Sequence, residues 1–393
     1  MKKMFIAAIM SLSLLSTSAF AEIKVGIILG FTGPIESLTP AMRDSAKLAF
    51  QEASDSGVLL GGETITVIEG DSTCVDSSAA QSVAESQVSQ GVVAIMGADC
   101  SGVTGAIASN VAVPNGVVMI SPSATSPGLT TLDDKGLFFR TAPSDARGGQ
   151  ILADITKDRG IKSVAITYTN NDYGKGLADV YEAAVKAHGI SVTVVAAHED
   201  GKADYSAEVG VLASAGGDAV AVIGYLDQGG KGIIQGSIDS GAFDTFILSD
   251  GMIGNSLTDA FGKSLNKSFG SLPGSTGKGA GIFTKVASAA GIDSSGPYTG
   301  ESYDAAALIV LAIQAGGSAD RASIAKNVMA VANGPGKKIY PGQLKKGLDL
   351  LAKGKAIDYE GATGVTFTDV GEAVGSFLEK EIKYGKFKTK KQR

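Results

Sequence analysis

The strongest constraint on the fold of this chain is a repeated alternation of short apolar segments with longer segments that are apolar on one side only. In the first half, strands are predicted at residues 23–30, 63–71, 92–98 and 117–122, with helical patterns between them. The second half repeats the arrangement, with strands predicted at residues 163–170, 191–199, 219–225 and 245–251. Buried strands that alternate with helices are typical of parallel sheets covered on both faces. We therefore predict an α/β fold with two mainly parallel sheets, each flanked by helices.

The rest of the chain is predicted to add helices and one more strand. Helices are expected near residues 279–290, 302–315, 321–332 and 343–352, and a strand at residues 363–369. A chain of 393 residues exceeds the length that a single hydrophobic core usually organises. Two domains are therefore expected.

The first 21 residues have the pattern of a secretory signal peptide. Lys2 and Lys3 precede an apolar run at residues 4–15, and a small-x-small cleavage site ends at Ala21. The apolar run is shorter than the roughly 20 residues that a membrane-spanning helix needs. We therefore expect cleavage after Ala21 and export, most simply to a bacterial periplasm.

The charge of the exported chain excludes some classes of partner. Loss of the signal peptide removes two lysines and leaves 32 basic and 40 acidic residues, a net charge of −8. This sign disfavours both nucleic acid and anionic membranes as partners of the chain as a whole.

The motifs of common enzyme classes are absent from the sequence. No G-x-G-x-x-G follows a predicted strand, and no G-x-S-x-G occurs. The GKS sequence at residues 262–264 resembles the end of a phosphate-binding loop, but Leu257 stands where that loop needs glycine. The only histidines, His188 and His198, lie at predicted element ends without a metal-binding cluster and are interpreted as surface residues. We expect a protein that is not an enzyme, with no metal or other cofactor.

The chain contains two cysteines, Cys74 and Cys100, about one helix and one strand apart. In an oxidising compartment such cysteines are more often paired than free. Closing the loop between them would stabilise the fold by roughly 3 kcal/mol. A catalytic or metal-binding thiol is the alternative interpretation of the same residues.

Polar residues gather where predicted strands end, which is where open α/β sheets bind ligands. Ser101 is expected as a helix N-cap, where free N–H groups favour a carboxylate. Thr125 offers a hydroxyl group, Ser123 offers a backbone carbonyl, and Asp250 would suit an ammonium group. Each has a structural alternative, which is a plain N-cap for Ser101 and a turn for Thr125 and Asp250. Together they favour the binding of a small zwitterion.

Several ordered motifs resemble those of the periplasmic branched-chain-amino-acid-binding (Leu/Ile/Val-binding) family, the solute receptors of ABC importers. They are EIKVGIILGFTGPI, VMISPSATSPGLT, FFRTAPSD, NNDYGKGLADVYEAAV and YTGESYDAAALIVLAI. A cysteine 26 residues before a CS sequence adds to the match. The resemblance covers essentially the whole mature chain.

The resemblance assigns ligand contacts residue by residue. Ser101 and Thr125 match the positions that bind the carboxylate of an amino acid. Ser123, followed by Ala124 in the same binding loop, matches the position whose carbonyl meets the ammonium group. Asp250 matches the acidic partner of that ammonium group.

Further positions would complete the cleft. Tyr173 and Tyr225 match tyrosines on the second lobe's face, and Leu38, Asp99 and Tyr298 fall where family members surround the ligand side chain. An aromatic residue often stands at the position of Leu38, and an apolar residue would suit leucine at the position of Asp99. If Asp99 faces the pocket unpaired, an apolar ligand is disfavoured by roughly 1–3 kcal/mol and a polar or cationic one is favoured. Otherwise Asp99 turns away and caps the helix predicted at residues 102–110.

The resemblance also implies the disulfide between Cys74 and Cys100 and a type I periplasmic binding protein fold, with two lobes joined by three crossings near residues 142, 273 and 375. The N-terminal lobe would comprise residues 22–142 and 274–374, and the C-terminal lobe residues 143–273 and 375–393. An amino acid or amino-acid-like solute would bind between lobes that close over it by hinge motion.

The partners implied by the resemblance are the membrane permease subunits of an ABC importer, on which a closed monomer would dock. A periplasmic sensor with the same two lobes and an exported hydrolase are the alternatives.

Overall fold

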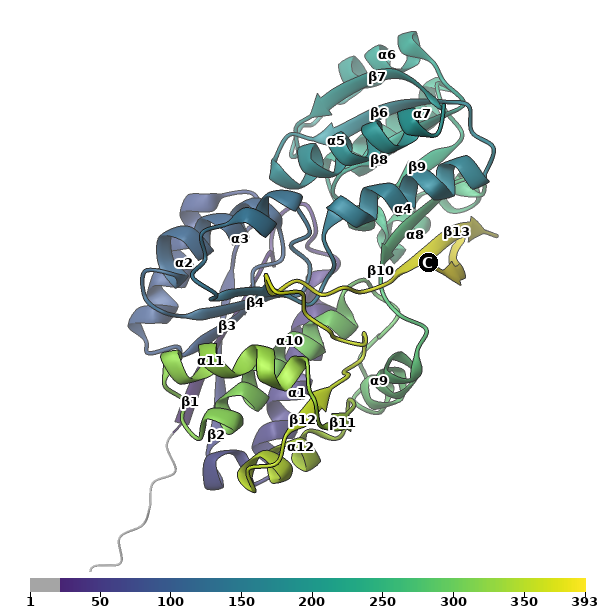
Figure 1. Ribbon diagram of the computed structural model, residues 1–393. Coiled ribbons are helices and arrows are strands. Elements are labelled where there is room, and N and C mark those ends of the chain that lie inside the picture. Colours follow the sequence, from purple (N-terminus) through teal and green to yellow (C-terminus); the bar gives the residue numbers. More distant parts are fainter. Residues whose placement is uncertain (1–21) are drawn as a thin grey trace, which may run out of the picture.

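The computed structural model describes residues 22–393, which fold into two lobes with separate β-sheets (Figure 1). The predicted signal peptide and its cleavage after Ala21 lie outside the described residues. Figure 1 shows the N-terminal strands in the lower lobe and the middle third of the chain in the upper one. The prediction of two mainly parallel, helix-flanked sheets is confirmed.

The first sheet has five parallel strands in the order β2-β1-β3-β4-β5. They are β1 (Glu22–Leu29), β2 (Thr64–Asp71), β3 (Ala94–Gly97), β4 (Val118–Ser121) and β5 (Phe138–Arg140). The helices of this lobe are α1 (Thr39–Asp55), α2 (Ser77–Ser89), α3 (Ser101–Ile107), α9 (Lys278–Ala289), α10 (Thr299–Gly316), α11 (Arg321–Ala332) and α12 (Leu344–Ala352). Strand β1 is a nearly continuous apolar run because helices cover both faces of the sheet.

The second sheet has seven strands in the order β14-β13-β10-β9-β8-β6-β7. Five are parallel, namely β6 (Ser163–Thr169), β7 (Ser191–His198), β8 (Ala219–Ile223), β9 (Phe246–Leu248) and β10 (Phe269–Pro273). The hairpin of β13 (Phe377–Lys383) and β14 (Lys386–Gln392) adds to them in antiparallel fashion. The helices are α4 (Asp145–Asp158), α5 (Asp172–Ala187), α6 (Ser206–Ala215), α7 (Gly229–Ser240) and α8 (Asn255–Phe261).

Three connections join the lobes. The chain leaves the first sheet after β5, builds β6 to β10 in the second, and returns to the lower lobe through α9. It then forms a small parallel pair, β11 (Lys337–Ile339) with β12 (Ile357–Tyr359), before it crosses back to β13. The carboxyl ends of the parallel strands of each sheet lie along one edge, where the loops that build a site converge.

The prediction of a strand at residues 363–369 is wrong. Only one isolated bridge occurs in this segment, between Phe367 and Ala373. The Asn333 side chain takes the place of a neighbouring strand, because its amide donates to the carbonyl of Phe367 at 2.8 Å and accepts from the same residue's N–H at 2.8 Å. Strands β10, β13 and β14 were not predicted, and the lysine-rich sequence of β14 has no apolar alternation that would reveal it.

Helix α10 forms the centre of the first lobe. Fifteen of its eighteen residues are buried, since it packs between α1, α11 and the sheet. Among residues 22–393, no helix is long and apolar enough to cross a membrane. Burial raises the pKa of Glu301, near the start of α10, to about 8. The backbone carbonyl of Glu301 accepts a hydrogen bond from Thr141 Oγ1 at 2.9 Å, beside the first connection between the lobes.

The stability of the protein should therefore depend on the protonation of Glu301. Between the ordinary pKa of about 4.5 and the folded-state pKa of about 8, the unfolded chain releases a proton that the folded chain keeps. The free energy of unfolding should fall as pH rises through this window, by up to about 4 kcal/mol between pH 5 and pH 8. Urea unfolding at both pH values measures the decline, and Glu301→Gln should make it smaller. An equal decline in wild type and variant would contradict the assignment to Glu301.

Candidate functional site

A small cavity lies between the lobes, at the carboxyl ends of the parallel strands. Its first-lobe wall comes from loops after β1, β3 and β4 and from α1, and most of its second-lobe wall comes from the start of α5 and from loops after β8 and β9. The lining residues are Ile35, Leu38, Met42, Asp99, Cys100, Ser101, Ser123, Tyr173, Tyr225, Asp250, Gly251 and Tyr298. The cavity therefore combines an apolar side with a polar, acidic side.

Eight of the residues predicted to contact a ligand line this cavity, namely Leu38, Asp99, Ser101, Ser123, Tyr173, Tyr225, Asp250 and Tyr298. Ala124 and Thr125 were also predicted, and they are buried but do not form part of the cavity wall. Sequence reasoning missed Ile35, Met42 and Gly251 as lining residues. Met42 lies on the buried face of α1, and nothing in the apolar pattern of that helix distinguishes a cavity wall from a core.

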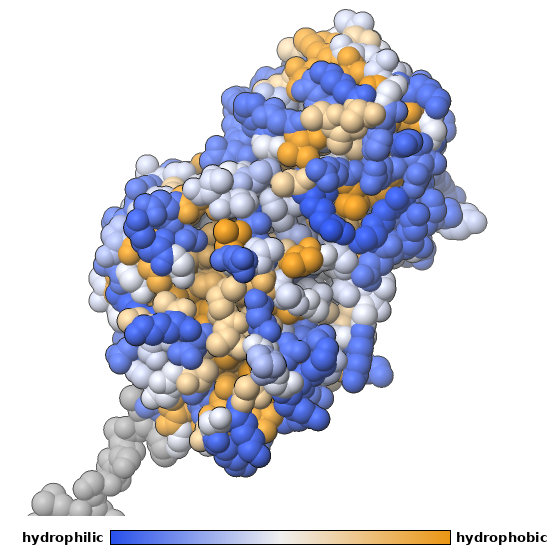
Figure 2. Space-filling view, in the orientation of Figure 1, coloured by the Kyte–Doolittle hydropathy of each residue, from blue (hydrophilic) through white to orange (hydrophobic). Residues whose placement is uncertain are grey.

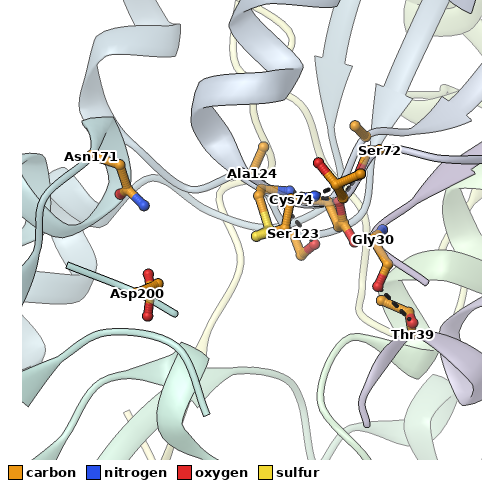
Figure 3. The surroundings of a disulfide bond; sticks show 12 residues. Gly30, Thr39, Ser72, Cys74, Ser123, Ala124, Asn171 and Asp200 are labelled. Carbon is orange, nitrogen blue, oxygen red and sulfur yellow. Dashed lines mark hydrogen bonds between the residues drawn. A yellow bond between two sulfur atoms is a disulfide. The ribbon is translucent and has the colours of Figure 1, made fainter. Parts of the chain in front are cut away.

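The disulfide between Cys74 and Cys100 is present, as predicted. It joins the loop after β2 to the residue that precedes α3. Figure 3 shows the first-lobe loops gathered around it, with Asn171 and Asp200 of the second lobe lying across from them. The disulfide thus holds together two of the loops that face the other lobe.

The loop after β3 begins with a close approach to β1. Gly97 has a φ of +133°, and a Cβ atom there would lie 2.2 Å from the carbonyl oxygen of Ile28. Only glycine fits this combination of backbone angle and contact. The close approach at Gly97 therefore places residues 99–101, which follow it, next to the end of β1.

Ser101 is the first residue of α3, so the prediction that it is the N-cap is wrong. Cys100 is extended and occupies the N-cap position, without a side-chain cap hydrogen bond. The Ser101 hydroxyl instead accepts a hydrogen bond from the N–H of Ser126 at 3.1 Å. A serine hydroxyl that accepts one bond still has its own hydrogen to donate, so Ser101 can act as a donor toward the cavity.

The Asp99 carboxylate is held by three donors from its own lobe. It accepts from the N–H of Gly30 at 2.6 Å, from the Ser72 hydroxyl at 3.1 Å and from the N–H of Cys100 at 2.9 Å. Burial raises its pKa, and these hydrogen bonds act in the opposite direction. Asp99 does not cap α3, which corrects one of the two expectations for it. The other expectation, an unpaired carboxylate facing the ligand, also fails because the oxygens are already bonded.

A fully buried arginine fixes the loop at residues 124–126 from behind. Arg140 donates to the carbonyl oxygens of Ala124 and Ser126, both at 2.9 Å. Its guanidinium group is paired with Glu372, on the segment that leads back to the second lobe. A backbone hydrogen bond joins the same two segments, since the N–H of Arg140 donates to the carbonyl of Gly371 at 3.0 Å.

Asp250 is the acidic residue of the second lobe's wall. Its carboxylate accepts hydrogen bonds from the hydroxyl groups of Tyr173, at 2.7 Å, and Tyr298. The Tyr173 ring stacks on Tyr225 with ring centroids 5.1 Å apart, which fixes both rings at the cavity. Burial raises the pKa of Asp250, and the two tyrosine hydroxyl groups lower it. The carboxylate is thus oriented, and none of the cavity-lining residues within 22–393 is basic.

A second buried carboxyl group, Asp145, was missed by the sequence analysis. It is the first residue of α4, and its N–H donates to the carbonyl of Thr125 at 2.8 Å. Within residues 22–393, Asp145 Oδ2 and Thr125 Oγ1 are buried without a hydrogen-bond partner. Burial and the nearby charge of Asp250 raise the pKa of Asp145 well above its ordinary value. The FFRTAPSD motif contains Asp145, but the motif alone does not show that the carboxyl group lies near Asp250.

The interpretation of both histidines as surface residues is wrong for His198. It is buried at the end of β7, its Nδ1 lies 2.8 Å from the hydroxyl group of Thr167, and burial lowers its pKa to about 4. It does not line the cavity. His188 is partly exposed and contacts Asp154 at 2.7 Å.

Comparisons with known proteins agree with this geometry. The model of a family described as "Periplasmic binding protein" matches residues 22–342. The Leu/Ile/Val-binding protein homolog 1 of Brucella melitensis is 32% identical over 318 residues, which cover 79% of this chain and 82% of that protein. Homolog 3 of the same organism is 32% identical over 218 residues, and the match spans 55% of this chain and 58% of that protein.

Solved structures share the fold. A leucine binding protein, LivK, from Thermotoga maritima superposes with a TM-score of 0.79 at 22% identity, covering 94% of this chain and 98% of that one. The LivJ protein of Streptococcus pneumoniae, solved in complex with isoleucine, gives 0.77 at 22% identity and covers 95% and 99%. A solute binding protein of R. palustris, solved in complex with 4-hydroxybenzoate, gives a TM-score of 0.74 at 17% identity. The match covers 95% of this chain and 97% of that one.

Two lobes with a cavity between them are the architecture of a solute-binding protein. The chain belongs to the periplasmic binding protein family, among the substrate-binding proteins of ABC transporters that include the Leu/Ile/Val-binding proteins.

The bonds of Asp99 predict a structural cost when it is replaced. Asp99→Leu should leave the N–H groups of Gly30 and Cys100 without their acceptor and lower the free energy of unfolding by about 3 kcal/mol. Urea unfolding measures the loss. Asp259→Leu, at an exposed aspartate outside the cavity, should change stability by less than about 0.5 kcal/mol. Unchanged stability in the Asp99 variant would mean that these bonds are not needed.

The ion pair behind the binding loop can be tested in the same way. Glu372→Gln should remove the partner of the buried Arg140 guanidinium and cost about 3 kcal/mol of unfolding free energy. The control is Asp133→Asn, which breaks an ion pair with Lys135 in which both side chains are more than half exposed. Thermal unfolding should show almost no change for this control. Equal effects of the two variants would contradict the role given to Arg140.

Proposed function

We propose that this protein binds an amino acid or a close relative in the cavity between its lobes and delivers it to the permease of an ABC importer. The observation that carries the proposal is the negative charge around the cavity. Asp99 and Asp250 line it, and none of the lining residues in the described chain is basic. Arg140 is already paired with Glu372. A ligand with an ammonium group would supply the positive charge that these buried carboxyl groups need.

In the proposed complex, the ammonium group of the ligand lies against Asp250 and the backbone carbonyl of Ser123. The ligand carboxylate accepts hydrogen bonds from Ser101 and from the loop of Ala124 and Thr125. The Thr125 hydroxyl lies beside the Asp145 carboxyl group, whose pKa it lowers, so the placement rests on the free hydrogen of Ser101 and on the loop backbone.

The apolar side of the cavity narrows the ligand class. Ile35, Leu38 and Met42 form that side. Asp99 lies near them, but its oxygens are occupied by donors of its own lobe, so it gives no reason to expect a cationic side chain. We therefore favour amino acids with neutral, largely apolar side chains, in place of the polar or basic ligands that an unpaired Asp99 would suggest.

An aromatic acid is the second candidate, because two structural neighbours were solved with 4-hydroxybenzoate and with benzoate. These anions carry a carboxylate and no ammonium group. In the cavity described here they would add negative charge beside Asp250, with no basic side chain on the wall. The charge of the site therefore favours the amino acid over the aromatic acid.

Ligand capture would use the connections between the lobes. We propose hinges near residues 142, 273 and 375, between an N-terminal lobe of residues 22–142 and 274–374 and a C-terminal lobe of residues 143–273 and 375–393. The protein would act as a monomer, and closure would present both lobes to the permease. A sensor that reports the same ligand to a membrane regulator would use the same motion, so transport by the assembled importer distinguishes the two functions.

The proposal is tested by thermal unfolding of refolded, ligand-free protein against a panel of amino acids, their amides and aromatic acids. A ligand at 100 times its Kd stabilises the native state by about 2.7 kcal/mol. Stabilisation by neutral amino acids and not by benzoate is expected. The stabilising compound should be recovered unchanged, whereas turnover would support an exported hydrolase. Stabilisation by benzoate alone would mean that the ligand is an aromatic acid and not an amino acid.

The role of Asp250 gives a sharper prediction. Asp250→Asn keeps an acceptor for one of the two tyrosine hydroxyl groups, offers an amide donor to the oxygen of the other, and removes the negative charge. Affinity for the amino acid found in the panel should therefore fall about 100-fold. Calorimetry measures the affinity, and Asp259→Asn serves as the control. The fold should be retained, because the amide removes a charge that is costly to bury. Unchanged affinity would mean that no ammonium group lies at Asp250.

A further inference from the structure

The C-terminal hairpin of β13 and β14 has a charge opposite to that of the rest of the chain. Residues 377–393 contain seven lysine and arginine residues and two glutamates. Residues 22–376 contain 25 basic and 38 acidic residues. The hairpin therefore has a net positive charge, whereas the chain as a whole has the net negative charge that disfavours binding to an anionic surface.

The lysines of the hairpin are exposed on an edge strand. Strand β14 is the outermost strand of the second sheet, and Lys386, Lys388, Lys390 and Lys391 on it are exposed. The last two lie within 4.0 Å of carboxylates. Among residues 22–393, no carboxylate lies within that distance of the Lys386 or Lys388 ammonium group, so both remain available to an external anion.

An aromatic residue projects from the tip of the hairpin. Tyr384 is 84% exposed and stands between Lys383 and Lys386 in the sequence. The turn is held in place because the N–H of Gly385 donates to Asn266 Oδ1 at 2.9 Å. Tyrosine is enriched at the boundary between water and lipid, where its ring lies among the headgroups. Lysines on an edge strand also prevent unwanted strand pairing, but that role does not need an exposed tyrosine.

The hairpin lies apart from the cavity. Strands β13 and β10 separate β14 from β9, and the cavity residue Asp250 follows β9. Figure 1 shows the hairpin in yellow beside β10, at the lower edge of the upper lobe. In the same orientation, Figure 2 shows mostly hydrophilic side chains over that part of the lobe. A partner bound to the hairpin would therefore not occupy the ligand site.

We propose that this hairpin docks the protein on the surface of a bilayer that contains anionic phospholipids. Lysines near such a surface are attracted to it, whereas charges farther away than the Debye length of about 8 Å are largely screened. The acidic remainder of the chain thus opposes binding weakly if the hairpin faces the membrane, and more strongly in other orientations. Since no helix in the described chain can cross a membrane, the contact is peripheral.

The test uses sedimentation of the mature full-length protein with vesicles. Vesicles of equal parts phosphatidylglycerol and phosphatidylcholine should bind the protein at low ionic strength, and vesicles of phosphatidylcholine alone should not. Salt at about 1 M, where the Debye length falls to about 3 Å, should release it. Absence of binding to the anionic vesicles, or equal binding to both kinds, overturns the proposal.

Variants locate the contact. The double substitution Lys386→Gln and Lys388→Gln should weaken partitioning about 25-fold, at about fivefold for each lysine. A matched pair of exposed lysines in the other lobe, Lys353→Gln with Lys355→Gln, should leave it unchanged. Equal loss in both double variants would overturn the assignment to the hairpin.

Two further measurements complete the test. Tyr384→Ser should weaken partitioning as well, and an unchanged value would contradict the placement of this ring in the headgroup layer. Thermal stabilisation by the ligand should be the same in all of these variants, because none of the substituted residues lines the cavity. The membrane contact and the proposed ligand binding can thus fail independently.

Discussion

A buried guanidinium group links the ligand-facing loop to the connections between the lobes. Arg140 binds two carbonyl oxygens of the loop at residues 124–126 and is paired with Glu372 on the third connection. A charge buried this deeply is tolerated only because both terminal nitrogens of the guanidinium group have hydrogen-bond partners, and only Nε lacks one. The loop therefore cannot shift without disturbing the third connection, and in the proposed closure a movement of that connection would change the position of Ser123 and Thr125.

The three carboxyl groups around the cavity differ in how far the protein satisfies them. Asp99 is bonded by three donors of its own lobe, Asp250 by two tyrosine hydroxyl groups, and Asp145 has one oxygen without a partner. Asp99 thus serves mainly to fix its loop, whereas Asp250 leaves a deficit of positive charge, because no basic residue lines the described cavity and the neighbouring Asp145 has a raised pKa. In the proposed binding mode a ligand removes that deficit, so closure around the correct ligand is easier than closure of the empty cleft.

Much of this arrangement is predictable from the sequence, because it rests on local patterns. Apolar strands and amphipathic helices revealed both sheets, and the polar loops after the strands together with the family resemblance supplied the eight predicted residues of the cavity wall. What could not be predicted depends on contacts between distant segments. Two of the three donors to Asp99 come from the distant residues 30 and 72. The raised pKa of Asp145 depends in part on Asp250, which is also distant in the sequence. The hairpin was missed for another reason, because the lysine-rich sequence of β14 has no alternation of apolar and polar residues that would predict a strand.

The disulfide has a consequence for when the protein becomes competent to bind. Cys74 and Cys100 connect two of the loops that face the second lobe, and the bond forms only in an oxidising environment. The family to which the chain belongs is periplasmic. A newly synthesised chain that still resides in the reducing cytosol lacks this connection between the loops after β2 and β3. In the proposed function, the face that contacts the ligand would therefore be completed only after export.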